Sequence, residues 1–416
     1  MRKPSSRTKT WAPVAAAVAL FAALGVGQAL LSRAAAAAAQ PAVQAPRYEV
    51  DPLWPKPLPN HWILGSAIGV AVDADDHIWI IHRSSATLAA NEKTLETKDS
   101  ECCAGAPPVL EFDQAGNLLR HWGGPGAGYE WPNSNHGIFI DYKGNVWIGG
   151  NGGPDSQVLK FTKDGKFLMQ VGKSGARRKA GAKAGANEGD QAGFVGGSND
   201  EVSFGRVAKI FVDPKENEAY LADGYLNKRV AVIDADTGKM KRWWGAYGHK
   251  PDDTPLGPYD PDAPPTQQFH TPVHCADMSL DRLLYVCDRI GDRLQVFTPD
   301  GKFVKEAFYA TRTKNQGSVF DIAFSRDPQQ KYIFIADGVN EKIRVVDRQT
   351  LKELTTFGDG GRQPGTFYGV HSIVTDAKGN LYTTETYEGK RVQRFIYKGM
   401  GSVAPEQGVV WPRASR

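Results

Sequence analysis

The sequence has few of the residues that mark several common classes of protein. Only four of its 416 residues are cysteines, and none forms a Cys-x-x-Cys or Cys-x-x-Cys-His pattern, which excludes a zinc ribbon and c-type haem attachment. The formal net charge is only +4, part of it in the N-terminal segment, so the sequence does not indicate nucleic-acid binding. Glycine, proline and tryptophan are plentiful, as is typical of many short strands joined by tight turns.

Residues 1–39 have the pattern of an export signal. Four basic residues, Arg2, Lys3, Arg7 and Lys9, precede an apolar run over 12–31 and a small-residue stretch over 34–39, with a cleavage site near Ala39. No Arg-Arg pair and no lipid-accepting cysteine accompany this pattern. The apolar run, about 20 residues long, is also sufficient for an uncleaved membrane anchor. We expect the protein to be exported to the periplasm or secreted, or to be anchored in a membrane and face the periplasm.

A repeating unit of about 40 to 50 residues follows. Each unit has a short apolar strand, a turn with Asp, Gly or Asn, a second apolar strand that ends in a polar or acidic residue, and a third strand. The units cover 66–122, 136–172, 206–245, 274–309, 320–358 and 371–399. Repeats of this length with strand patterning predict an all-β, six-bladed β-propeller over 66–399.

The segments outside the regular repeat have their own character. Residues 40–65 are proline-rich and expected to be extended, and Tyr48-Glu-Val-Asp51 within them is a candidate outer strand that closes the ring. Residues 400–416 form a C-terminal tail. An insertion over 84–108 interrupts the first unit. Residues 174–203 are rich in Gly, Ala, Lys and Arg, which predicts a mobile surface loop, with a lid over one mouth of the propeller as the alternative.

The first strand of each unit opens at an equivalent position, here called the lead position, whose occupants alternate. In chain order they are Ile68, His136, Ala208, His274, Phe320 and His371. In a closed ring the three imidazoles would lie about a third of a turn apart and face one axis. Three neutral imidazoles and an open coordination position are typical of catalytic zinc, or of another divalent transition metal. Polar lining of the channel without a metal is the alternative.

Three more candidates fall just past the second strand of a unit. Arg83 has this place in the first unit, Tyr225 in the third and Arg289 in the fourth. Taken singly, each is more often a surface arginine or a packing tyrosine, but their shared location near the proposed metal favours a functional role. Recurring acidic residues favour structural roles instead. Those ending second strands are expected to cap turns or pair with a basic residue of the third strand: Asp223, Asp288, Asp337 and Glu385. Those ending first strands read as turn residues: Asp73, Asp141, Asp213 and Asp376.

Four cysteines fit an oxidising compartment without making a disulfide scaffold. Cys275 and Cys287 fall on the two strands of a predicted hairpin centred on Asp281 and would face each other. A cross-strand disulfide and two buried thiols are both compatible with this placement. Cys102 and Cys103 are adjacent, and a bond between such neighbours would be strained.

The repeats resemble NHL-type repeats and, more narrowly, the peptidyl-α-hydroxyglycine α-amidating lyase family, also called peptidylamidoglycolate lyase. The resemblance covers most of 66–399. It is densest in four segments: Ile80-Ile-His-Arg83, Asp223-Gly-Tyr-Leu-Asn-Lys-Arg229, Thr271-Pro-Val-His-Cys-Ala276 and Cys287-Asp-Arg-Ile-Gly-Asp-Arg293. The repeat alone is shared with many binding propellers, whereas the combination of histidines, arginines and tyrosine is more specific.

The resemblance implies a set of roles for these residues. It implies zinc held by His136, His274 and His371, a catalytic Tyr225, and two active-site arginines, Arg83 and Arg289. The implied reaction cleaves an N-acyl α-hydroxyglycine, a small-molecule or peptide substrate with a carboxylate, into an amide and glyoxylate.

The chain also departs from the family pattern. The family holds a calcium ion through backbone oxygens near Val70 and Ile138 and through an aspartate after the third histidine, where this chain has Ser372. The family's disulfides do not map cleanly onto these cysteines. The two insertions could reshape the mouth and alter the substrate, and no room exists for the copper monooxygenase fused to animal versions.

Other functions remain compatible with the sequence. One is a non-enzymatic NHL propeller that binds a protein, peptide or glycan. Another is a different metal-dependent propeller enzyme, such as a lactonase-type hydrolase, although such sites usually hold calcium with carboxylates. A third is a lyase of this fold that acts on another substrate. Contact with a membrane is expected only if the N-terminal segment stays attached.

Overall fold

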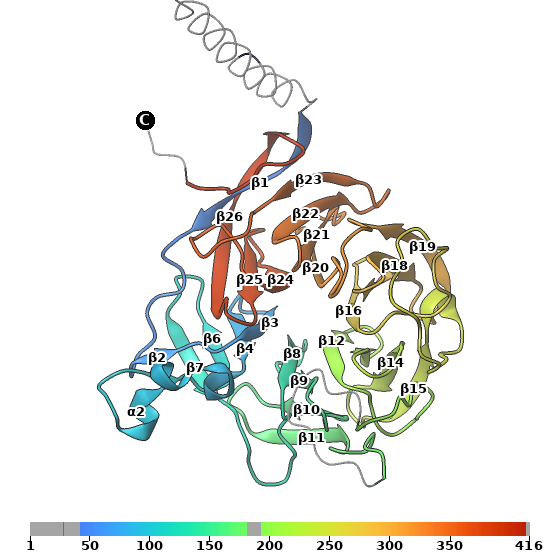
Figure 1. The fold of residues 1–416 in the computed structure, drawn as a ribbon, viewed down its shortest axis with the longest axis horizontal. Helices are drawn as coiled ribbons and strands as arrows, with labels where there is room; N and C mark the ends of the chain where they lie inside the picture. The colour runs from blue at the N-terminus through green and yellow to red at the C-terminus, as the bar shows by residue number, and fades with distance from the viewer. Residues whose placement is uncertain (1–27, 29–41, 181–192, 413–416) are drawn as a thin grey trace, which may run out of the picture.

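The computed structural model describes residues 28, 42–180 and 193–412, and it contains six four-stranded antiparallel sheets arranged as blades around one axis (Figure 1). The predicted all-β, six-bladed β-propeller is therefore confirmed. The export signal or anchor lies outside the described residues. In the part of the chain that the structure does describe, no helix has the length and apolar character needed to cross a membrane.

The blades follow one another in chain order, and in all but the last the strands do so too. Blade one contains β3 (Ala67–Val72), β4 (Ile78–His82), β6 (Val109–Phe112) and β7 (Leu118–Trp122). Blade two contains β8 (Asn135–Ile140), β9 (Val146–Gly150), β10 (Gln157–Phe161) and β11 (Phe167–Gly172). Blade three contains β12 (Val207–Asp213), β13 (Glu218–Asp223), β14 (Arg229–Asp234) and β15 (Met240–Trp244).

The second half of the ring repeats this pattern. Blade four contains β16 (Val273–Met278), β17 (Leu284–Asp288), β18 (Arg293–Phe297) and β19 (Phe303–Phe308). Blade five contains β20 (Asp321–Phe324), β21 (Tyr332–Asp337), β22 (Lys342–Asp347) and β23 (Glu353–Phe357). Blade six contains β24 (Val370–Thr375), β25 (Leu381–Glu385), β26 (Arg391–Val403) and, from the other end of the chain, β1 (Val43–Asp51).

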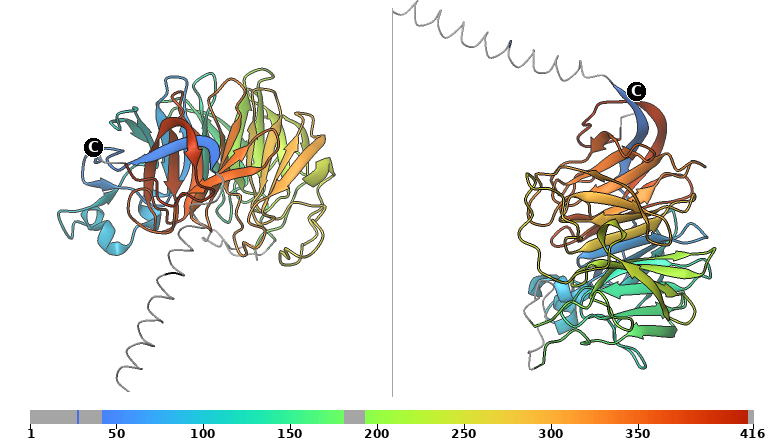
Figure 2. Two further views of the ribbon diagram at one scale, coloured as in Figure 1. Left: turned by 90° about the horizontal axis from the view of Figure 1, so that it is seen from above. Right: turned by 90° about the vertical axis from the view of Figure 1, so that its right-hand side faces the viewer.

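Strand β1 closes the ring. It pairs antiparallel with β26, from Val43 opposite Val403 to Asp51 opposite Arg394, as the edge-on views also show (Figure 2). The candidate closing strand is thus confirmed, and it begins five residues earlier than Tyr48. The C-terminal residues add to the seam, because the Val50 amide donates to the Val410 carbonyl at 2.8 Å. β1 thus covers the outer edge of β26 and becomes the outermost strand of blade six.

The hydrophobic core is divided among the contacts between blades. Six clusters of buried apolar side chains each join two neighbouring blades, and the cluster with Trp54, Ile80 and Tyr382 joins blade six to blade one. Alternate strand residues face opposite sides of a blade. Both faces of the inner strands are buried, because each blade packs between two neighbours. Burial of this apolar surface stabilises the ring as a whole and fixes where its inner strands lie.

Acidic side chains organise the turns and strand ends. Asp141 accepts from the Lys143 and Asn145 amides at 2.9 and 2.8 Å, as expected of a turn residue. The carboxylates that end second strands form ion pairs with arginines of the third strands, and this prediction is confirmed. The pairs are Asp223 with Arg229, Asp288 with Arg293, Asp337 with Arg344 and Glu385 with Arg391, at 2.6–2.8 Å.

The irregular segments lie around the blades. The insertion in blade one forms η1 (Ser84–Thr87), η2 (Ala90–Glu92), the single turn α2 (Thr94–Thr97) and β5 (Ala104–Gly105), which pairs with β2 (Trp62–Ile63). A further turn, η3, spans Ala246–Gly248. The described ends of 174–203 are held by an ion pair between Arg177 and Asp200 at 2.6 Å. Residues 181–192 lie outside the described part, so the mobile loop and its lid alternative stay predictions.

Candidate metal centre

The lead residues reach the axis because the inner strands are irregular there. In five blades the pairing of the first strand with the second shifts at the lead position, for example between Asn135 and Ile138 and between Val273 and Cys275. A residue left out of the ladder at such a bulge can turn its side chain away from the regular alternation. In the three histidine blades the freed side chain is an imidazole that points at the axis.

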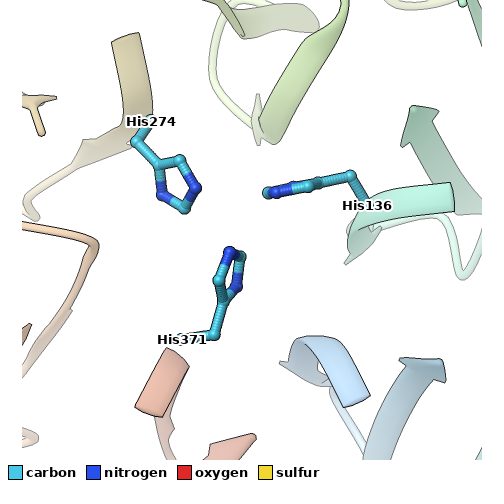
Figure 3. A group of neighbouring side chains, drawn as sticks. All are labelled: His136, His274 and His371. Atoms are coloured by element: carbon cyan, nitrogen blue, oxygen red, sulfur yellow. The ribbon is translucent and has the colours of Figure 1, made fainter. Parts of the chain in front are cut away.

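The three imidazoles meet at one point (Figure 3). His136 comes from β8, His274 from β16 and His371 from β24, and one nitrogen from each lies within 4.8 Å of the others. The ring centroids are 4.8–5.1 Å apart. All three side chains are buried, with 2–3% exposure. The sequence therefore identified three side chains that the fold brings together from residues up to 235 positions apart (136 to 371).

Backbone carbonyls of the next blade orient each imidazole. The Nδ1 of His136 lies 2.7 Å from the Ala208 oxygen, and that of His371 lies 2.7 Å from the Ile68 oxygen. The Nδ1 of His274 lies 2.5 Å from the Phe320 oxygen. A carbonyl oxygen can only accept, so each Nδ1 carries the proton and each Nε2 has its lone pair free. This support by the intervening lead residues was not predicted, because any residue provides a carbonyl.

Burial keeps the imidazoles neutral. Desolvation is the main cause that lowers the pKa of all three histidines well below the ordinary value. The positive charge of Arg83 adds to this effect at His136, and that of Arg289 adds to it at His274. A neutral imidazole with a fixed tautomer is the form that binds a metal ion.

Tyr225 lies beside two of the histidines. Its hydroxyl is 2.9 Å from the His136 Nε2 and 3.0 Å from the His274 Nε2. One hydroxyl proton cannot be donated to both nitrogens, so this buried pocket has more lone pairs than protons to satisfy them. A cation corrects such a shortage, and the residues present therefore fit a zinc ion. Zinc–imidazole bonds of about 2.0–2.1 Å require the rings to approach a little further.

The two arginines differ in their contacts. The Nη1 of Arg289 donates to the Tyr225 hydroxyl at 3.2 Å, and the guanidinium lies over the Phe320 ring at 4.7 Å. Its side chain is 6% exposed, its Nε has no hydrogen-bond partner among the described residues, and none of their carboxylates pairs with it. Arg83 donates through Nη2 to the Asn151 amide oxygen at 3.1 Å. Asn151 was not predicted, and it follows the second strand of blade two as Arg83 follows that of blade one.

The neighbouring His82 has a structural role. Its Nδ1 accepts from the Gly65 and Ser84 amides at 3.1 and 3.0 Å, and its Nε2 donates to the Pro107 carbonyl at 3.0 Å. Burial lowers the pKa of His82 to about 4. Because both nitrogens are engaged, this histidine is not available to a metal ion, and it instead fixes the backbone that carries Arg83.

The residues implied for calcium were also located in the structure. Ile138 and Ser372 line a small axial cavity next to the histidines, whereas Val70 is buried in the core between blades. The Ser372 hydroxyl donates to Asp321 at 2.6 Å, and the positive charge beside Asp321 is the ammonium of Lys209. The residues present here therefore do not fit a calcium ion.

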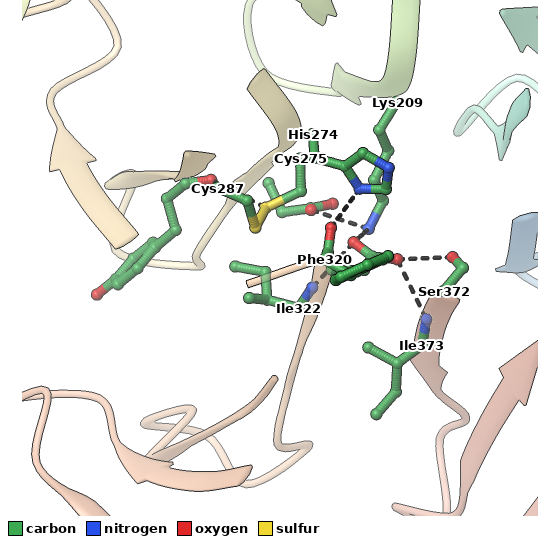
Figure 4. Close-up of a disulfide and its surroundings, with 11 residues drawn as sticks. Lys209, His274, Cys275, Cys287, Phe320, Ile322, Ser372 and Ile373 are labelled. Atoms are coloured by element: carbon green, nitrogen blue, oxygen red, sulfur yellow. Dashed lines mark hydrogen bonds and ion pairs between the residues drawn. A yellow bond between two sulfur atoms is a disulfide. The ribbon is translucent and has the colours of Figure 1, made fainter. Parts of the chain in front are cut away.

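A disulfide lies next to one of the three axial histidines. The structure joins Cys275 to Cys287, with 4.8 Å between their Cα atoms, and these residues face each other across β16 and β17 (Figure 4). The bond ties the strand of His274 to the strand that precedes Arg289. Of the two states compatible with the sequence, a disulfide and two buried thiols, the structure has the disulfide. The structure also joins the adjacent Cys102 and Cys103.

A cleft adjoins the site on the side of Tyr225 and Arg289. Its volume is about 1010 Å³, and its lining includes Leu226, Thr271 and Ile290. Leu226 and Ile290 are the sequence neighbours of Tyr225 and Arg289, which do not themselves line the cleft. Lys228 and Lys314 also line it, which gives the cleft a partly basic wall.

Comparisons with known proteins give only distant matches. No family model matches the chain. Among solved structures, the chain is similar to a streptogramin B lyase, with 12% identity over 86% of this chain and 98% of that one and a TM-score of 0.47. It is similar to a catalytically inactive virginiamycin B lyase from Staphylococcus aureus with quinupristin, with 14% identity, coverage of 87% and 89%, and a TM-score of 0.44. A protein of unknown function from Bacteroides thetaiotaomicron has 15% identity, coverage of 85% and 76%, and a TM-score of 0.48. Likeness at this level does not extend to activity.

Proposed function

We propose that this protein is a zinc-dependent lyase that cleaves the C–N bond of an N-acyl α-hydroxyglycine and releases an amide and glyoxylate. One observation carries the proposal: three buried imidazoles, the Tyr225 hydroxyl and the Arg289 guanidinium converge at one point on the axis. The resemblance to peptidylamidoglycolate lyase names the substrate. The geometry supports it, because a base and a cationic group lie beside the proposed metal.

Tyr225 is the proposed proton carrier. In the reaction the substrate hydroxyl loses its proton, the C–O bond becomes a carbonyl, the C–N bond breaks, and the nitrogen gains a proton. The Tyr225 phenolate oxygen accepts the first proton and returns it to the departing nitrogen, so no other reactant is needed. When bound, zinc supplies a Lewis acid that stabilises negative charge on a substrate oxygen.

The two arginines have separate proposed roles. Arg289 already donates to the Tyr225 hydroxyl at 3.2 Å, and its positive charge favours the phenolate form. Arg83 is the proposed partner of the substrate carboxylate, which a guanidinium can bind through two parallel hydrogen bonds. This grip orients the C–N bond relative to Tyr225. The adjoining cleft is wide enough for the acyl part of a small molecule or a peptide.

We place this activity in the periplasm or outside the cell. The disulfide between Cys275 and Cys287 supports an oxidising compartment. The pattern of residues 1–39 supports export, and contact with a membrane is proposed only for a chain that keeps that segment.

Elemental analysis of the purified protein is the first test. We expect about one zinc per chain, and then release of glyoxylate from an N-acyl α-hydroxyglycine in proportion to the zinc content. Protein without a transition metal would instead favour a binding propeller. Zinc-loaded protein that releases no glyoxylate would favour a lyase or hydrolase acting on another substrate.

A further inference from the structure

A largely buried ammonium group lies just beyond the histidines along the axis. Lys209 follows Ala208 on β12, and its side chain is 13% exposed. Its Nζ lies 2.9 Å from the Asp277 carboxylate and 2.5 Å from the Asp321 carboxylate (Figure 4). Lys209 thus brings together side chains from blades three, four and five.

Asp321 extends this network to blade six. Its Oδ2 accepts from the Ser372 hydroxyl at 2.6 Å and from the Ile373 amide at 3.1 Å. Its Oδ1 accepts from the Ile322 amide at 2.9 Å. The network therefore links the inner strands β12, β16, β20 and β24 across the axis.

The network adjoins the supports of two histidines and the third histidine itself. Lys209 follows Ala208, whose carbonyl orients His136, and Asp321 follows Phe320, whose carbonyl orients His274. Ser372 directly follows His371. The charges of this network therefore fix the backbone on which the imidazoles depend.

The network depends on its positive charge. Two carboxylates so close together and shielded from water repel each other unless a cation lies between them. The pKa of Asp277 is raised, mainly by burial and further by the negative charge of Asp321, while Lys209 opposes the shift. Without the ammonium, Asp277 and Asp321 would need a proton or another cation.

The space left beside the ammonium is too small for a calcium ion. The axial cavity bordered by Gly69, Ile138, Lys209 and Ser372 has a volume of about 10 Å³, which is near the minimum for one water molecule. A side chain at Gly69 or Gly137 would overlap a backbone oxygen, at 2.8 or 2.5 Å from the added Cβ. The inner strands thus close tightly around the ammonium.

We propose that Lys209 is the resident cation of an axial anionic pocket formed by Asp277 and Asp321, and that it replaces a structural calcium ion. The chain is therefore stable without calcium. Removal of the ammonium exposes a site for a divalent cation with two carboxylates and the Ser372 hydroxyl, which are oxygen ligands of the kind that calcium prefers.

The test compares the zinc-loaded wild type with Lys209→Met, each with and without millimolar calcium chloride. For the wild type we expect no bound calcium and no change in Tm. For Lys209→Met in calcium-free buffer we expect Tm to fall by about 5 °C or more, because a buried ion pair has lost one partner. Calcium should restore most of this loss and bind at about one ion per chain.

Lys160→Met is the matched control. Lys160 is also buried and lies 3.8 Å from both Asp141 and Asp236, but it belongs to β10 and lies away from the axis. We expect its substitution to lower Tm without any response to calcium.

Three outcomes would overturn the proposal. They are calcium bound at one ion per wild-type chain with a rise in Tm, a Lys209→Met variant as stable as the wild type, and a destabilised variant that calcium does not restore. If Lys209→Met does not fold, calcium binding and Tm of the wild type still test the proposal. None of these measurements depends on lyase activity, so the proposed reaction can fail without affecting this result.

Discussion

The even and odd blades of the propeller contribute differently to the same site. Blades two, four and six provide an imidazole at the lead position, whereas blades one, three and five provide a backbone carbonyl from Ile68, Ala208 and Phe320. Each carbonyl holds the imidazole of the preceding blade. The residues at the axis thus repeat every second blade, although the strand pattern repeats in every blade.

The even blades thus supply the side chains of the proposed metal site, and the odd blades supply the carbonyls that orient them. The even blades need one residue type, because only histidine gives a neutral nitrogen ligand at this position. The odd blades need only an intact backbone, so their lead side chains differ in size. Partners that orient metal ligands are commonly as important as the ligands, and here the backbone provides them. Substitutions can therefore test the two halves of the ring separately.

The largest expected effect is the loss of an even-blade ligand. His274→Ala should lose bound zinc and reduce turnover to background, because two imidazoles remain of three. Zinc content and glyoxylate release measure the two effects. Ile68→Val is the odd-blade counterpart, and it should keep its zinc because the carbonyl is retained. Equal loss of zinc in both variants, or full zinc and activity in His274→Ala, would contradict the separate roles of even-blade side chains and odd-blade carbonyls.

Tyr225→Phe should give the next largest effect. The variant keeps all three imidazoles and their carbonyl partners, so zinc content should not change. Turnover should fall by about 10²- to 10⁴-fold, since general acid–base groups commonly contribute that much. Tyr247→Phe is a suitable control, because the Tyr247 hydroxyl bonds Glu306 at 3.0 Å, away from the axis. A wild-type rate in Tyr225→Phe would remove the proposed proton carrier.

Arg83→Ala should have a smaller effect, mainly on substrate binding. We expect KM for an N-acyl α-hydroxyglycine to rise by about 10- to 100-fold, as for the loss of a charged hydrogen bond of about 1.5–3 kcal/mol. An amide analogue that lacks the carboxylate should be affected much less. Arg83→Lys should recover little, because an ammonium cannot form the paired hydrogen bonds of a guanidinium. Unchanged kinetics with the acidic substrate would exclude the role.

The smallest expected effect concerns pH and the metal-free protein. The folded state lowers the pKa of His371 well below 6.5, so the unfolded chain binds more protons as the pH falls through that value. The contribution of His371 to the free energy of unfolding should therefore be complete above pH 6.5 and should decrease as the pH falls toward the folded pKa. His371→Gln should reduce the slope by up to about 1.4 kcal/mol per pH unit. Urea unfolding between pH 5 and 8 measures it, and an unchanged slope would contradict neutral burial.

Much of the architecture could be predicted because its signals are local. A strand pair and its turn occupy about twenty residues, and the repeated pattern gave the blades and their order. The lead position made His136, His274 and His371 equivalent before any contact was known. Arginine pairs such as that between Asp223 and Arg229 followed in the same way, because both residues have fixed places within one unit.

The remaining features depend on contacts that no single unit contains. Lys209, Asp277 and Asp321 occur once each in three different units, so the repeat pattern does not relate them. The carbonyl partners have no side-chain signal at all. The calcium expectation came from the family resemblance, from which Ser372 departs, and the sequence could not show that a lysine from another blade supplies positive charge there. Such groups meet only when the ring closes.

Closure by β1 also sets when the ring can be completed during synthesis. The strand β1 is synthesised before every other blade strand, but its partner β26 ends at Val403, so a nascent chain remains an open arc until synthesis has passed Val403. His371 belongs to the same last blade, which means that the third ligand is likewise the last to arrive. Binding of the proposed metal would therefore require completion of the ring, and a chain that ends before β24 would lack both the seam and the third histidine.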